Sequence, residues 1–80
     1  MWVWQEQGHL VLMPYTAEQL NWLVKYCKAQ LGKSHGQMSD WQVVHRSKPN
    51  PPGTSGYYPK RQAVIVRNLL LKTQLSLMFA

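Results

Sequence analysis

The chain has 80 residues, with nine lysines and arginines against three acidic residues, which gives a formal net charge of +6. A chain of this length buries only about 60–65% of its unfolded surface, so we expect one domain, residues 1–80, with a thin core. Its single cysteine, Cys27, excludes a disulfide within the chain and is typical of a reducing compartment. Three histidines and one cysteine at scattered spacings match no zinc pattern, so we expect no metal and no cofactor.

The positive charge is confined to the second half of the chain. The acids and lysines up to Asp40 cancel, and no acid follows. Six basic residues then remain without compensation: Arg46, Lys48, Lys60, Arg61, Arg67 and Lys72. This asymmetry indicates an anionic partner, which is nucleic acid, an acidic protein surface or an acidic membrane face.

A membrane role ranks last among these. The longest apolar-leaning stretch, residues 63–79, is interrupted by Arg67 and Lys72 and is shorter than the roughly 20 residues that a spanning helix needs. The first residues lack a basic segment and a small-residue cleavage site. We therefore expect a soluble, cytoplasmic protein without a membrane partner.

Residues 2–13 are predicted to form a β-hairpin. Aromatic and β-branched residues fill 2–4 and 10–12, and Gly8 stands in the segment between them. Trp2 and Trp4 share one face of the first strand because side chains alternate. We expect that face to pack on the helix that follows.

Residues 16–31 are predicted to form that helix. Thr16 and Gln19 fit a capping box, and Gly32 stands where a left-handed C-cap is expected. Apolar residues recur on one stripe at helical spacing: Leu20, Leu23, Val24, Cys27 and Leu31. Cys27 is expected to be a buried apolar residue rather than a nucleophile.

Trp22 and Tyr26 form a second ridge on this helix, either exposed or meeting the hairpin. Residues 41–46 could be a strand or a short helix, and their aromatic and β-branched residues favour a strand. Residues 47–59 hold four of the five prolines and two of the five glycines, so they are predicted to be a long loop.

Residues 62–78 lack glycine and proline, and their length favours one helix. A strand over 62–67 followed by a short helix is the alternative, because residues 64–66 are β-branched. The predicted class is α+β: an N-terminal hairpin and a third strand packed on one or two helices.

The candidate binding residues surround the long loop. Cations neutralise phosphates and aromatic rings stack on bases, which is the combination that single-stranded nucleic acid needs. The predicted set is Trp41, Arg46, Lys48, Tyr57, Tyr58, Lys60 and Arg61. If the functional face lies elsewhere, the Trp2/Trp4 hairpin and the Trp22/Tyr26 ridge are the alternatives.

The main hypothesis is a small non-enzymatic module, with no catalytic residues, that binds nucleic acid or a nucleic-acid-processing protein. Trp, Tyr, Met and Arg are enriched at protein interfaces, so an inhibitor or adaptor of phage or mobile-element type, binding an acidic surface of a host protein, is the first alternative. A homo-oligomer also fits this composition. The second alternative is a metal-free ribonuclease or toxin that uses His45 as acid or base, with Lys60 or Arg61 stabilising the transition state.

Overall fold

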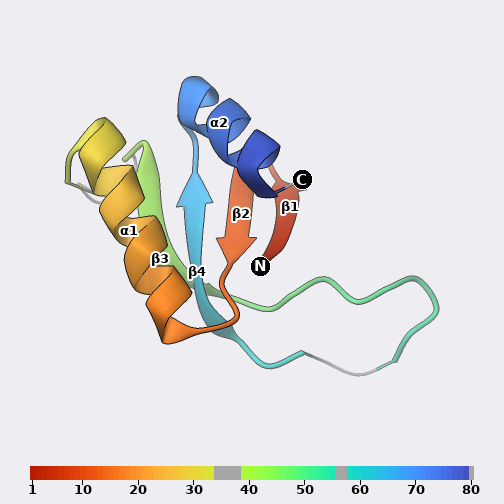
Figure 1. Cartoon of the computed structure of the whole chain (residues 1–80). Helices are drawn as coiled ribbons and strands as arrows, with labels where there is room; N and C mark the ends of the chain where they lie inside the picture. Colours follow the sequence, from red (N-terminus) through yellow and green to blue (C-terminus); the bar gives the residue numbers. More distant parts are fainter. Residues whose placement is uncertain (34–38, 56–57, 80) are drawn as a thin grey trace.

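A computed structural model describes residues 1–33, 39–55 and 58–79 of the chain. Four strands and two helices follow one another in the order ββαββα (Figure 1). Their bounds are β1 Trp2–Glu6, β2 His9–Met13, α1 Ala17–Leu31, β3 Trp41–Arg46, β4 Arg61–Val66 and α2 Leu69–Phe79. The α+β class is confirmed, and the hairpin, the helix after it and the third strand lie where the sequence predicts them.

The sheet is antiparallel, and its strands lie in the order β1-β2-β4-β3. The two central strands, β2 and β4, pair with each other through Leu12 and Val64. Leu23 of α1 and Leu75 of α2 belong to one buried cluster with these two strand residues. Since alternate residues of a strand point to one face, both helices cover the same face of the sheet.

No helix in the described part of the chain covers the opposite face, yet the middle of that face is buried. Val11 and Ile65 are 0% and 1% exposed. The indoles of Trp2 and Trp4, from the edge strand β1, pack against them. The expectation that these tryptophans pack on the following helix is therefore wrong. Val3, between them, packs in the helix-side cluster, and strand alternation turns both indoles the other way.

A two-residue turn joins β1 to β2. Gln7 and Gly8 both have positive φ, 50° and 83°, as a type I′ hairpin turn requires. Gly8 adopts this conformation without the steric cost that Gln7 bears. Lys72 of α2 donates from Nζ to the carbonyl oxygen of Gly8 at 2.7 Å, which links the turn to the second helix.

The cap positions predicted for α1, Thr16 and Gly32, are confirmed, but Gly32 is not the expected left-handed C-cap, because its ψ is −164°. The side-chain oxygen of Thr16 accepts a hydrogen bond from the backbone N–H of Gln19 at 3.1 Å. The Gln19 side chain reaches back one residue further than a standard capping box, to the N–H of Tyr15 at 2.9 Å. At the other end, Gly32 has a φ of 78° and its N–H donates to the Lys28 carbonyl.

The two ridges of α1 have different surroundings. Cys27 is fully buried, as expected, and burial raises the pKa of its thiol to about 11. Trp22 stacks on Tyr26 with ring centroids 5.3 Å apart and meets Phe79 of α2 edge-on at 5.9 Å. The aromatic ridge therefore meets the second helix through Trp22, which stays 44% exposed, while Tyr26 packs against the helix-side cluster that includes Leu10 and Leu12 of the hairpin.

Residues 62–78 do not form the single expected helix; that expectation is wrong, and the alternative of a strand followed by a helix is correct. The β-branched run at 64–66 pairs with strands on both sides, which outweighs the helical preference of a long run without glycine or proline. Asn68 then starts α2 as its N-cap, since its Oδ1 accepts from the N–H of Leu71 at 3.0 Å.

Replacing this cap should destabilise the protein. We expect Asn68→Ala to lower the free energy of unfolding by about 1 kcal/mol, because the N–H of Leu71 loses its acceptor. Urea denaturation followed by circular dichroism measures the change. Asn21→Ala, at an exposed position inside α1, is the matched control and should not lower stability, because alanine has the higher helix propensity. Equal stability of wild type and Asn68→Ala would contradict the assigned start of α2.

Candidate functional site

The β3–β4 pairing brings the two ends of the long loop together. Arg46, the last residue of β3, lies directly opposite Arg61, the first residue of β4. Both stand at positions that share the face not covered by helices. Like charges directly opposite each other destabilise a sheet, and residues 41–80 contain no acid to offset them. An anion bound at this end of the sheet would relieve that repulsion.

Trp2 lies against the cations of the loop. The ammonium group of Lys48 is 4.4 Å from the centroid of the Trp2 ring and 4.9 Å from that of Tyr58. The guanidinium carbon of Arg61 is 5.6 Å from the Trp2 centroid. These are cation–π distances. The structure thus joins part of the predicted loop site to one residue of the alternative hairpin face. We call this set the basic aromatic surface: Trp2, Arg46, Lys48, Tyr58, Lys60 and Arg61.

The linker before α1 fixes the position of Trp2 and Arg61. Tyr15 packs edge-on against the Trp2 ring, with centroids 4.7 Å apart. Its carbonyl oxygen accepts a hydrogen bond from Nη2 of Arg61 at 2.9 Å. Arg61 is therefore held by the fold as well as exposed, whereas Lys60 is exposed and makes no such contact with the described residues.

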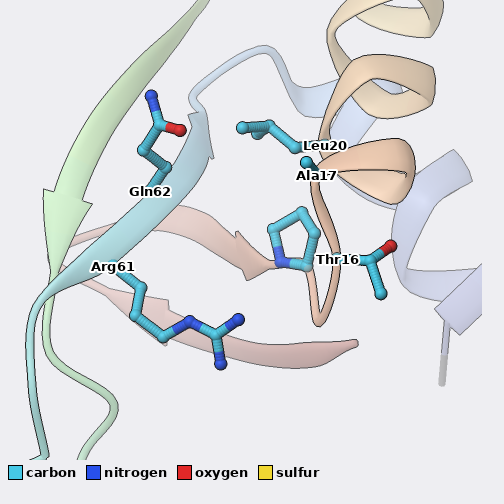
Figure 2. A pocket seen from close by; sticks show the side chains of 6 residues that line it. Thr16, Ala17, Leu20, Arg61 and Gln62 are labelled. Carbon is cyan, nitrogen blue, oxygen red and sulfur yellow. The ribbon is translucent and has the colours of Figure 1, made fainter.

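Two hollows flank Arg61. One, of about 130 Å³, lies within the basic aromatic surface and is lined by Trp2, Met13, Lys48, Tyr58, Pro59 and Arg61. Figure 2 shows the other, of about 170 Å³, between the start of α1 and β4, with Thr16, Ala17, Leu20 and Gln62 around it. In that view the Arg61 side chain lies below those of Ala17 and Leu20. The first hollow is the one that combines aromatic rings with cations.

The remaining predicted residues lie apart from this surface or outside the described structure. Trp41 is only 2% exposed, and its indole donates to the Gly32 carbonyl at 2.9 Å, so it is a core residue. Tyr57 lies outside the described residues. His45 is adjacent to Arg46 in β3 and so points to the opposite face of the sheet from Arg61.

The sequence contains a signal for Trp2, but not a decisive one. Strand alternation groups Trp2 with Trp4, yet both faces of the central strands are apolar, so the pattern does not say which face receives the indoles. The long-range β2–β4 pairing decides this, and no local motif encodes it. The contact between Trp2 and the loop cations follows from that pairing.

His9, the first residue of β2, lies on the face of the sheet that the helices do not cover. Its Nε2 is a buried side-chain nitrogen for which the described structure offers no hydrogen-bond partner. Burial, and then the nearby Arg67 guanidinium, lower the pKa of this imidazole. At the same end, Arg67 donates to the Ser39 carbonyl at 3.1 Å, and the Trp4 indole donates to Glu6 at 3.0 Å.

A separate apolar surface lies on α2. Four of its side chains are between 48% and 79% exposed: Leu69, Leu70, Leu77 and Met78. A groove of about 300 Å³ beside them is lined by Met1, Gln19, Trp22, Met78 and Phe79. Uncharged side chains line this groove, so it does not suit a phosphate backbone. The predicted homo-oligomer stays a prediction, for which this surface is the apolar candidate.

Comparison with known proteins gives no assignment: no protein-family model, no curated protein and no solved structure matches the chain. Within residues 1–33, 39–55 and 58–79, no group of three or more His, Cys, Asp or Glu is placed to hold a metal ion. Neither helix in that part of the chain is long and apolar enough to cross a membrane.

The partly buried His9 should make stability depend on pH. Its pKa is lowered from 6.5 in the folded protein, so the unfolded chain takes up the proton first as the pH falls. The free energy of unfolding therefore decreases as the pH drops below 6.5 and levels off below the folded pKa. We expect His9→Gln to flatten this dependence in urea titrations from about pH 8 to about pH 5.

His45→Gln, which removes a histidine from an exposed position, is the control for this experiment. A His9→Gln variant that loses stability with falling pH as steeply as the wild type would show that the burial of His9 is not the cause.

Proposed function

We propose that this chain is a small, non-enzymatic nucleic-acid-binding module that uses the basic aromatic surface. One observation carries the proposal: Arg46 and Arg61 lie opposite each other on neighbouring strands. Beside them, the rings of Trp2 and Tyr58 already contact a cation, the ammonium group of Lys48. Phosphate contacts from such cations supply most of the affinity of sequence-independent nucleic-acid binding.

The aromatic rings favour nucleic acid over an acidic protein surface as the ligand. Carboxylates on a protein would use the cations alone, whereas a nucleic acid offers phosphates to the cations and bases to the rings. Trp2, Tyr58, Lys48 and Arg61 all line one hollow, so both kinds of contact are available within one surface. An acidic protein partner is the alternative that the binding experiment below would reveal.

The absence of catalysis is part of the same proposal. The ribonuclease hypothesis needs His45 beside Lys60 or Arg61, so that a proton carrier and a cation act on one phosphate. His45 and Arg61 occupy opposite faces of the sheet. This separation supports binding of a phosphate chain more than its cleavage by His45 and Arg61 together.

Removing two cations from the basic aromatic surface should weaken the dependence of binding on salt. We expect Arg46→Gln with Lys60→Gln to reduce the slope of log Kobs against log salt by about 1.4, the contribution of two phosphate contacts to a single strand. Fluorescence anisotropy of a labelled oligonucleotide measures the slope. Neither side chain anchors the fold: Arg46 donates to its neighbour His45, and Lys60 is exposed.

The control is Lys25→Gln with Lys33→Gln, which removes the same charge from exposed positions in and just after α1. This variant should keep the slope of the wild type within a few tenths. Equal losses in both double variants would mean that overall charge, and not this surface, governs binding. No binding to any oligonucleotide at low salt, together with a protein partner retained from nuclease-treated lysate, would replace nucleic acid with an acidic protein.

A further inference from the structure

In the hollow of the basic aromatic surface, a lysine of the chain itself forms part of the wall and lies over both aromatic rings. The Lys48 ammonium lies 4.4 Å from the Trp2 ring centroid and 4.9 Å from the Tyr58 ring centroid. Trp2 belongs to β1, whereas Lys48 and Tyr58 lie near the two ends of the long loop. One flexible side chain thus contacts both rings of a hollow that also has Arg61 in its wall.

A lysine ammonium group binds only weakly to such a pair of rings. A cation over an exposed ring is held by the ring quadrupole alone, and the ammonium gives up part of its hydration to approach it. A nucleobase presents a flat π-face of its own and stacks on an aromatic ring over a larger area. A phosphate next to that base would attract the same ammonium group. When a base replaces the lysine on the rings, the rings gain a larger stacking contact and the ammonium gains a phosphate.

We infer that the basic aromatic surface takes single-stranded nucleic acid, with one unpaired base stacking against Trp2 and Tyr58 in place of Lys48. Lys48 then moves to a phosphate beside that base, and Arg61 contacts the neighbouring backbone. This inference rests on the proposed function and names the form of nucleic acid. The bases of a duplex are paired and stacked on each other, so a duplex offers phosphates to the cations but no base to the rings.

The two aromatic residues differ in what they do for the fold, which decides the choice of variants. Trp2 packs on the buried cluster of the sheet, so its truncation would also disturb folding. Tyr58 is 36% exposed in the loop, outside the helices and strands. Tyr58→Ala therefore removes a ring with little effect on the core, and Tyr58→Phe, which keeps the ring, is the matched control.

The experiment compares three probes of about 12 nucleotides: a single strand, its duplex, and a single strand of abasic residues with the same phosphates. We expect the wild type to bind the single strand about tenfold more tightly than the abasic strand. Tyr58→Ala should lose this preference for the single strand, while its affinity for the abasic strand stays the same. Tyr58→Phe should keep the preference of the wild type. Lys48→Gln should weaken binding of the single strand and of the abasic strand alike.

Indole N–H signals in a nitrogen–proton NMR spectrum supply a second readout. Adding the single strand should shift the Trp2 signal, whereas adding the abasic strand should shift it less. Trp41, buried and bonded to the Gly32 carbonyl, is the internal reference and should not move.

The outcomes separate the inference from the proposed function. Equal affinity for the single strand, the duplex and the abasic strand, unchanged in Tyr58→Ala, would overturn base stacking while nucleic-acid binding stands. No binding of any of the three probes at low salt would overturn the proposed function and this inference with it.

Discussion

In the described part of the chain, both helices lie on one face of the sheet, yet the central strands are buried on both faces. The rest of the structure depends on how the second face is covered. An antiparallel sheet can leave one face to water when that face is polar, but here Val11 and Ile65 make it apolar. Their cover comes from the edge of the same sheet, as Trp2 and Trp4 lie across the central strands. The indoles complete the core and at the same time form the outer surface of this face.

Trp2 therefore takes part both in the packing of the sheet and in the basic aromatic surface. One side of its ring system packs on the sheet, and loop cations and Tyr15 contact the rest. A structural role and a ligand-binding role are usually treated as competing explanations of an aromatic residue. Here a single indole serves the first and is available for the second, because neither helix of the described residues covers that face of the sheet.

The sequence predicts what local chemistry determines and fails where distant segments decide. The caps at Thr16 and Gly32 and the proline-rich loop depend on neighbouring residues, so they could be predicted. For residues 62–78 the sequence leaves one helix and a strand followed by a helix both open, because the pairing of β4 with two other strands decides the structure of the first half. The burial of Trp41 and the contact between Trp2 and Lys48 depend on the same pairing. The sequence therefore predicts the cations of the candidate site, whereas it offers Trp2 only as part of an alternative face.

The strand order also dictates when the molecule becomes complete. β4 is the fourth strand to be synthesised but lies between the second and the third. A hairpin alone is marginally stable in water, so β1 and β2 gain a firm partner only after about fifty more residues have been added, a separation that makes such pairing slow. Until then Trp2 has neither the buried cluster beneath it nor Arg61 beside it. A nascent chain therefore has no assembled basic aromatic surface until the last strand has entered the sheet.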